Sequence, residues 1–314
     1  MKNVLVTGAG GFIGSNMVMY LLENTDYIIY GIDNFQGGRK NEPLIKNMQS
    51  NRFIFVDGCF SRIKDLCPHI VFDNVYHFAA TPRVSYSVNH PIETNENNVS
   101  NTLSLLEFCK ETKVKKFIFS SSSSVYGDLV SFPTKENSIK SPKSPYALQK
   151  SIIEDYCRLY SSLYGLDTVC LRYFNVYGPG QYADNAYATV ICAWIKGFIE
   201  NSDIRLDGDG SQSRDFTYVS DVCNANYIAG ESEEVFGGKC FNAAGGNNYS
   251  LMDVKNIIES LSENRPLITQ QPSRAGDVLK THSDSSELGK LGFKTKIELE
   301  EGIKETYEWY KKII

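Results

Sequence analysis

The sequence predicts an α/β protein built on a doubly wound parallel sheet, with a smaller mixed α/β lobe toward the C-terminus. In the first half, short apolar, β-branched runs alternate with helical patterns, as expected of parallel strands joined by crossover helices. A glycine-rich turn follows the first of these runs. After Arg172 the regularity gives way to glycine-rich loops. With 314 residues, 42% of them hydrophobic, the chain is long enough for one large or two moderate domains.

The expected elements follow in chain order. Strands are predicted over residues 4–7, 27–32, 53–56, 75–77, 117–120 and 168–172, and helices over residues 13–23, 102–112 and 146–164. We assign residues 1–172 to the sheet domain, to which the chain returns around residues 216–242, and residues 173–314 mainly to the lobe. The lobe, with a helix near 188–199 and a charged helix from residue 298, is expected over the carboxyl ends of the strands, where open α/β sheets bind ligands.

Composition argues against several classes of protein. The formal net charge is −5 and no dense Lys/Arg cluster occurs, which disfavours nucleic-acid binding. The eight cysteines include no Cys-x-x-Cys pair and are interpreted as reduced and structural. None of the four histidines is spaced as a metal ligand, so no metal is predicted. The first strand begins almost at Met1, without an apolar signal or membrane segment, so a cytoplasmic location without membrane attachment is expected.

The turn after the first strand has the spacing Gly8-x-x-Gly11-x-x-Gly14. Gly8 can make the tight turn, Gly11 can admit a pyrophosphate against the backbone, and Gly14 can let the helix approach the sheet. The amides at the helix N-terminus then face the phosphates. A simple tight turn between strand and helix is the alternative. The context favours a Rossmann-type dinucleotide-binding domain.

Asp33 ends the second predicted strand. A carboxylate there can accept hydrogen bonds from both hydroxyls of the adenosine ribose and would repel a 2′-phosphate. Arg39 and Lys40, which follow soon after, weaken this preference slightly. The predicted cofactor is therefore NAD rather than NADP.

Tyr146 and Lys150 are four residues apart on a predicted helix and therefore share one face. A tyrosine beside an ammonium can act as an acid or base near neutral pH, because positive charge favours the phenolate. Tyr307 and Lys311 have the same spacing in a charged tail and are interpreted as part of a solvated helix. A run of five serines, residues 120–124, lies a short distance before the first pair, whereas nothing comparable stands near the second, so an enzyme is predicted.

Several motifs in a fixed order resemble those of the extended short-chain dehydrogenases that act on sugar nucleotides. They are Gly8-x-x-Gly11-x-x-Gly14, His77-Phe78-Ala79-Ala80, Ser122 four residues before Tyr126-Gly127, Tyr146-x-x-x-Lys150 and Arg172-Tyr173-Phe174-Asn175. Within this epimerase/dehydratase family, segments 185–188, 208–216 and 274–278 make the chain most similar to UDP-N-acetylglucosamine 4-epimerases. The likeness spans essentially the whole length.

The resemblance implies a UDP-hexose 4-epimerase with tightly bound NAD. Tyr146 would take the proton of the sugar 4-hydroxyl, Ser122 would bind that hydroxyl, and Lys150 would hold the nicotinamide ribose and depress the tyrosine pKa. Hydride would leave C4, giving a transient 4-keto sugar, and return on the opposite face. The implied reaction interconverts UDP-GlcNAc and UDP-GalNAc, with UDP-Glc and UDP-Gal as further substrates.

The resemblance also assigns binding residues. Cofactor contacts are implied for Gly8, Gly11, Phe12, Ile13, Gly14, Asp33, Asn34, Asp57, Gly58, Ala79, Ala80, Tyr146 and Lys150. Contacts with the UDP-sugar are implied for Ser122, Ser123, Ser124, Asn175, Thr189, Val190, Arg214, Arg274 and Asp277. The two arginines and Asn175 would lie near the diphosphate and Asp277 near the uridine ribose, although surface arginines in loops are the alternative.

The sequence leaves other readings open. Arg83 either points to solvent or binds a charged sugar substituent, as a UDP-glucuronate 4-epimerase would require. Ser123 and Ser124 stand where related dehydratases and decarboxylases carry carboxylates, so a lyase ranks below an epimerase. A binding protein without turnover ranks lower still. Phe60 is expected to stack on the adenine or to pack near it.

A homodimer is expected, because the long apolar faces of the helices near residues 102 and 146 could pair across a two-fold axis as they do in relatives.

Overall fold

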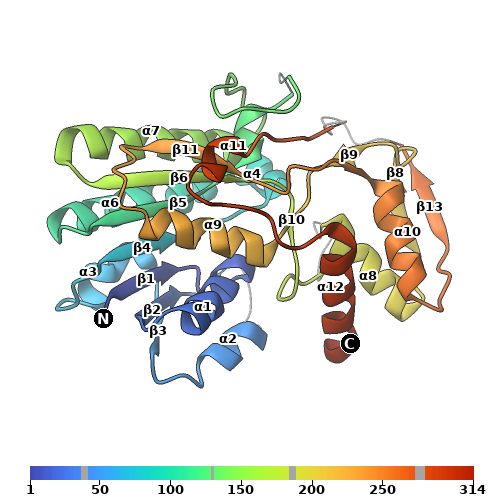
Figure 1. Ribbon diagram of the computed structural model, residues 1–314, viewed down its shortest axis with the longest axis horizontal. Helices are drawn as coiled ribbons and strands as arrows, with labels where there is room; N and C mark the ends of the chain where they lie inside the picture. The colour runs from blue at the N-terminus through green and yellow to red at the C-terminus, as the bar shows by residue number, and fades with distance from the viewer. Residues whose placement is uncertain (37–41, 129–130, 184–188, 273–279) are drawn as a thin grey trace.

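The computed structural model describes residues 1–36, 42–128, 131–183, 189–272 and 280–314. Its centre is a seven-stranded, wholly parallel sheet in the order β11-β6-β5-β4-β1-β2-β3 (Figure 1). The strands are β1 (Asn3–Thr7), β2 (Ile28–Asp33), β3 (Phe53–Asp57), β4 (Asn74–His77), β5 (Lys116–Ser122), β6 (Asp167–Tyr173) and β11 (Lys239–Ala243). The predicted doubly wound fold is confirmed.

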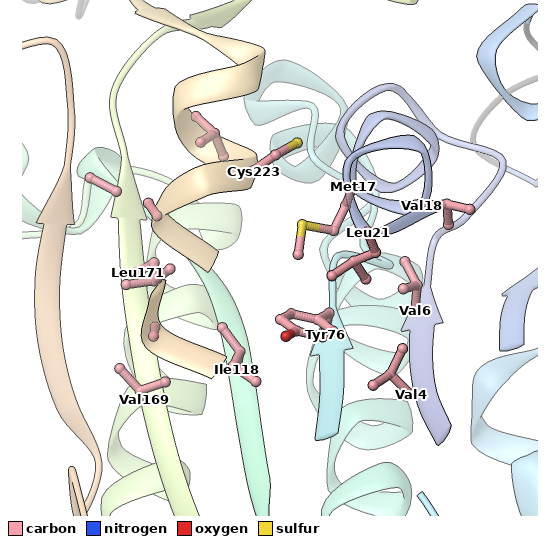
Figure 2. Close-up of a cluster of buried hydrophobic side chains, with 14 of the residues drawn as sticks. Val4, Val6, Met17, Val18, Leu21, Tyr76, Ile118, Val169, Leu171 and Cys223 are labelled. Carbon is pink, nitrogen blue, oxygen red and sulfur yellow. The ribbon is translucent and has the colours of Figure 1, made fainter. Parts of the chain in front are cut away.

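Helices cover both faces of the sheet. One face carries α1 (Phe12–Asn24) and α9 (Val219–Glu231), and the other carries α6 (Asn101–Glu111) and α7 (Pro145–Tyr164). Alternation along β1 separates the two cores, since Val4 and Val6 pack toward α1 while Leu5 packs on the other side. Figure 2 shows Val4 and Val6 facing the same cluster as Met17 of α1.

Short helices occupy the crossovers and loops. They are α2 (Glu42–Asn47), a 3₁₀ helix η1 (Phe60–Arg62), α3 (Ile63–Leu66), α4 (Val84–Asn89), α5 (Pro91–Asn95), a π-helix η2 (Glu96–Ser100), a 3₁₀ helix η3 (Ser123–Tyr126) and α11 (Ser286–Gly289). Because η3 directly follows β5, the serine run passes from the strand into a tight helical turn at the carboxyl edge of the sheet.

A second group of elements lies beside the sheet, at the right of Figure 1. It contains α8 (Val190–Glu200), α10 (Leu251–Leu261) and α12 (Leu299–Ile313), with β8 (Ile204–Asp207) paired to β13 (Ile268–Gln271). Two further pairs join β7 (Val176–Tyr177) to β10 (Thr217–Tyr218) and β9 (Ser213–Arg214) to β12 (Tyr249–Ser250). Its core includes Trp194 and Phe198. The proposed domain boundaries themselves remain a prediction.

The interpretation of Tyr307 and Lys311 as a merely solvated pair is wrong for the tyrosine. Tyr307 is only 6% exposed and packs in the core of the second group with Trp309 and Tyr310, whereas the Lys311 side chain is exposed. Helix α12 is amphipathic, and its buried aromatic face holds it against α8 and α10.

In the parts of the chain that the structure describes, no helix is both long and apolar enough to cross a lipid bilayer. Across these same residues, His, Cys, Asp and Glu side chains form no group of three suited to a metal ion. All eight cysteines are free, and six of them are buried.

Candidate active site

The turn after β1 is sterically closed to side chains. Gly8 has φ +70°, and a Cβ there would lie 2.8 Å from the Ala79 nitrogen. A Cβ on Gly14 would lie 2.0 Å from the Gly8 oxygen, so only glycine lets the first turn of α1 approach this loop. A Cβ on Gly11 would meet only the Gly8 oxygen, at 3.2 Å. The backbone at Gly11 is therefore approachable, as a bound pyrophosphate would require.

Asp33 lies beside this glycine turn because β1 and β2 are adjacent and parallel. One carboxylate oxygen accepts a hydrogen bond from the Gly10 N–H at 2.9 Å and the other from the Phe35 N–H at 2.7 Å. Burial raises the pKa of Asp33, and these N–H groups act against the shift. A fixed carboxylate next to a glycine turn fits the adenosine half of NAD.

Further predicted cofactor residues line the same edge. Asp57 is exposed at the end of β3, in register with Asp33, and the Gly58 N–H donates to the Asp33 carbonyl at 3.0 Å. The Ala79 N–H donates to Thr7 Oγ1 at 3.1 Å, directly behind the turn. The remaining members of this set are half-buried: Phe12, Ile13, Asn34 and Ala80.

The Phe60 ring is not accessible for stacking on an adenine. It is 5% exposed and packs 5.0 Å from the His77 ring within the core beneath the strands. The buried position of the ring does not agree with the expected stacking on an adenine. His77 is itself held between Thr7 and Thr102, and burial lowers its pKa to about 3, so it is neutral.

Ser122 and Tyr146 meet at the carboxyl edge of β5. Ser122 is the last residue of the strand, and Tyr146 lies in the first turn of α7, which Ser144 caps by accepting a hydrogen bond from the Ala147 N–H. The Ser122 side chain is hydrogen-bonded to that of Tyr146. Burial raises the pKa of Tyr146 to about 12, with the Ser122 hydrogen bond acting in the opposite direction.

Ser124 extends this contact by one more residue. Its N–H and its hydroxyl both donate to Ser122 Oγ, at 3.2 and 2.9 Å. Ser122 therefore accepts from Ser124 and is left to donate its own proton to the tyrosine oxygen. Ser123, between them, is half-buried in the same 3₁₀ turn.

Lys150 lies one helical turn beyond Tyr146, with its ammonium 5.8 Å from the centre of the Tyr146 ring. Its Nζ donates to the Ser120 carbonyl at 2.6 Å. Burial lowers the pKa of Lys150 to about 7. The expected depression of the Tyr146 pKa by Lys150 is not produced by the protein's own groups, because burial dominates both side chains.

The predicted sugar-nucleotide residues lie in and near the second group of elements. The Asn175 side-chain nitrogen donates to the Asp215 carbonyl and to Thr281 Oγ1, at 2.9 and 3.2 Å. Arg214, in β9, donates to the Ser213 carbonyl at 3.0 Å. The side-chain nitrogen of Asn175 is thus engaged within the protein.

Thr189 and Val190 lie farther along the chain, at the start of α8. The Thr189 hydroxyl donates to Gln181 Oε1 at 3.0 Å. Arg274 and Asp277, together with the segments 185–188 and 274–278 of the resemblance, lie outside the described residues.

Two residues that sequence reasoning did not select complete the site. The Ser87 hydroxyl accepts a hydrogen bond from the Tyr146 N–H at 3.1 Å, which ties α4 to α7. Glu154, one turn beyond Lys150, forms a buried ion pair with Arg172 at 2.7 Å. The four-residue spacing of Tyr146, Lys150 and Glu154 could have indicated Glu154, whereas nothing local marks Ser87.

A model of the NAD dependent epimerase/dehydratase family matches residues 4–244. The chain belongs to this family. In solved structures it is similar to the UDP-N-acetylglucosamine 4-epimerase of Methanobrevibacter ruminantium in complex with UDP-N-acetylmuramic acid, with 34% identity, a TM-score of 0.90 and coverage of 100% of this chain and 99% of that one. The predicted family and its use of NAD are confirmed.

Two other solved epimerases are comparably similar. UDP-glucose 4-epimerase of Thermotoga maritima with UDP-glucose has 34% identity and a TM-score of 0.89, with 99% of both chains covered. UDP-glucuronic acid 4-epimerase of Bacillus cereus with UDP-glucuronic acid and NAD has 32% identity and a TM-score of 0.88, over 99% of this chain and 100% of that one. The three sugars differ, so similarity alone does not select among them.

Proposed function

We propose that this protein inverts C4 of UDP-N-acetylhexosamines, interconverting UDP-GlcNAc and UDP-GalNAc, with UDP-Glc and UDP-Gal as further substrates. In coarser terms it is an NAD-dependent UDP-sugar 4-epimerase, as its solved neighbours are. The proposal rests above all on the buried contact between Ser122 and Tyr146, with Lys150 one turn away, at the same sheet edge as the glycine turn.

The protein's own groups suit proton transfer at the sugar 4-hydroxyl. Tyr146 takes the proton, and Ser122 binds the same oxygen while Ser124 fixes its orientation. The Lys150 ammonium uses one N–H on the Ser120 carbonyl and keeps two for the nicotinamide ribose. The glycine turn, Asp33 and Lys150 would hold NAD, which would supply a reversible acceptor for the C4 hydride of the sugar.

The preference for an N-acetylated sugar rests on likeness in sequence and in structure. The chain resembles UDP-N-acetylglucosamine 4-epimerases along its length, and one of them is a structural neighbour at 34% identity. Thr281 is of modest size, and its hydroxyl is fixed by the Asp215 N–H and by Asn175. The family resemblance aligns Thr281 with a wall residue that, when bulky, excludes an N-acetyl group, so a residue of modest size at this position is compatible with one.

A UDP-glucuronate 4-epimerase is the second candidate, favoured by Arg83. This exposed arginine immediately precedes α4, and α4 is tied to the Tyr146 backbone through Ser87. An arginine carried by that helix could bind a sugar carboxylate. The similarity to the Bacillus cereus enzyme agrees with this candidate.

A substrate panel tests both candidates. Purified protein is incubated with UDP-GlcNAc, UDP-Glc and UDP-glucuronate separately, and the products are resolved by liquid chromatography. We expect UDP-GalNAc from UDP-GlcNAc, and no released carbon dioxide or 4-keto-6-deoxy sugar. Turnover of UDP-glucuronate alone would overturn the N-acetylhexosamine assignment, and loss of turnover in an Arg83→Ala variant would then support the second candidate.

We further propose that the protein forms a homodimer through α6 and α7. Leu159 and Leu163, four residues apart on α7, are 44% and 61% exposed. Leu148, on the same helix, is 50% exposed. Apolar side chains repeated along a solvent-facing helix favour burial against a second copy.

A further inference from the structure

Three residues on one face of α7 meet three consecutive residues of the serine run. The helix residues are Tyr146, Lys150 and Glu154, each four positions after the last. Lys150 donates a hydrogen bond to the Ser120 carbonyl, and the Ser121 hydroxyl donates one to Glu154 Oε1 at 2.6 Å. The Ser122 side chain is hydrogen-bonded to that of Tyr146. Ser121 therefore sits between the two strand residues that hold the catalytic pair.

Glu154 is fixed from the other side by Arg172 of β6. The arginine Nε and Nη2 donate to the two carboxylate oxygens at 2.7 and 2.8 Å, and the two residues are 4% and 3% exposed. Arg172 is also the register partner of Ser121 on the neighbouring strand. A two-pronged contact of this kind fixes both position and angle of the carboxylate.

Arg172 reaches the far end of the serine run as well. Its Nη1 donates to the Tyr126 hydroxyl at 2.7 Å and to the Glu136 carbonyl at 2.9 Å. Tyr126 ends η3, the turn that begins with Ser123 and supplies Ser124 to Ser122. The ion pair thus fixes both the strand end that carries Ser122 and the turn that carries Ser124.

Burying an ion pair is a poor route to stability, because desolvation offsets most of the attraction, and an apolar pair of equal volume often serves as well. Neither Glu154 nor Arg172 contacts Tyr146 or Lys150 through a hydrogen bond that the structure shows, so the pair is not part of the proton path. A role in placing the serine run therefore explains the ion pair better than a gain in stability does.

We propose that Glu154, held by Arg172, is a positioning residue for the catalytic pair: through Ser121 it fixes the strand segment that binds Tyr146 and Lys150. This inference rests on the proposed function. The Glu154 charge has a second effect, since it favours the ammonium form of Lys150. The other titratable groups around that ammonium are Tyr146 on α7, Cys170 on β6 and His77 on β4.

Ser121→Ala is the sharpest test, because it removes the hydroxyl and leaves the ion pair whole. We expect kcat to fall roughly 10- to 100-fold with KM unchanged, because small misplacements of catalytic groups lower the rate by factors of this size. Ser161→Ala is the matched control. That serine also joins α7 to its neighbouring strand region, donating to the Leu166 carbonyl at 2.7 Å, but at the far end of the helix. It should leave kcat unchanged.

Glu154→Gln separates charge from placement. We expect the alkaline limb of its pH–activity profile to move to lower pH, because Lys150 loses a favourable negative neighbour. The Ser121→Ala variant keeps the Glu154 charge, so the alkaline limb of its pH–activity profile should stay at the wild-type position. A purely structural ion pair would lower the melting temperature of Glu154→Gln without moving the limb.

Hydrogen exchange provides a readout that does not depend on turnover. A peptide covering residues 120–126 should exchange faster in Ser121→Ala than in wild type, and at the wild-type rate in Ser161→Ala. Unchanged exchange, or equal kcat in Ser121→Ala and wild type, would overturn the inference. Absence of wild-type turnover with every UDP-sugar would instead overturn the proposed function, and the exchange experiment would still decide the positioning role.

Discussion

At the scale of single residues, burial controls the acid–base chemistry of the site. It raises the pKa of Tyr146 to about 12 and lowers that of Lys150 to about 7, so both are biased toward their neutral forms. A neutral phenol is a weak base at pH 7. Positive charge on the oxidised nicotinamide would shift Tyr146 back toward the phenolate, so we expect the proposed base to be effective only with the oxidised cofactor in place.

Tyr146→Phe should lower kcat about 10²- to 10⁴-fold, the usual contribution of a general acid or base. The fold should persist, because the phenol is held by Ser122 while the ring itself packs in place. Turnover is measured with the best UDP-sugar of the panel, and UDP binding by calorimetry. Wild-type turnover in this variant would remove Tyr146 from its assigned role.

Glu154→Gln should also change how stability depends on pH. Burial opposes ionisation of Glu154, but the hydrogen bonds and charge of Arg172 prevail, and its pKa lies below the ordinary 4.5. Because the folded-state pKa is depressed, the stabilisation is complete above about pH 4.5 and disappears as pH falls through the folded value.

Urea unfolding at several pH values checks this expectation. Near pH 7 the variant should be less stable than wild type by ~3 to 5 kcal/mol, the usual cost of leaving one buried charge unpaired. The difference should shrink below pH 4.5. A difference that is constant down to pH 3 would mean that the carboxylate titrates alike in the folded and unfolded chains.

At the scale of elements, the strands were predictable because buried parallel strands are short, continuous apolar runs. β11 was not predicted as a strand. Its sequence, Lys239–Ala243, includes Asn242, whose buried amide donates to the Thr134 carbonyl and accepts from the Tyr126 hydroxyl. The hydrogen-bond partners of this polar residue lie far away in the sequence. Asn242 therefore interrupts the continuous apolar run from which a buried strand is predicted.

In the candidate site, too, some residues could be predicted from local sequence patterns and others could not. Tyr146 and Lys150 could be found because helical spacing brings them together, and the glycine turn because its backbone leaves no room for side chains. The pairing of Glu154 with Arg172 joins a helix to a strand and follows only from the packed fold. The burial of Tyr307 was not predicted, because the many charged residues of the C-terminal segment indicated a solvated helix although its aromatic residues form a buried face.

Gly14→Ala tests the first turn of α1. The added methyl would lie 2.0 Å from the Gly8 oxygen, so the helix must shift away from the loop. We expect a loss of stability of ~1 to 3 kcal/mol, as for other overpacked sites, together with weaker NAD binding. Thermal unfolding and calorimetric titration with NAD measure the two effects.

Gly289→Ala is the matched control, because a Cβ there meets nothing within 4 Å and the residue closes a helical segment. Its stability and NAD affinity should equal those of wild type. If Gly14→Ala behaved in the same way, the close approach of α1 to the loop would have no role in holding the cofactor.

At the scale of the whole molecule, the exposed leucines of α7 predict its assembly. The double variant Leu159→Glu, Leu163→Glu should convert a dimer to a monomer, because burying two unpaired carboxylates in an apolar interface is strongly unfavourable. Sedimentation velocity measures the mass. Leu267→Glu, at a residue 65% exposed in the second group of elements, should remain dimeric. A wild-type monomer would rule out the proposed interface.

The late position of β11 in the chain determines which fragments of the protein can complete the sheet and when the sheet can be completed during synthesis. β6 lies between β5 and β11, and β11 is reached only after α8, β8 and α9 have been traversed. A fragment ending at Tyr173 would leave the backbone of β6 open along one side and would expose the part of the sheet that α9 covers, beside α1. On the ribosome, the nucleotide-binding half therefore stays unfinished until about residue 243 has emerged.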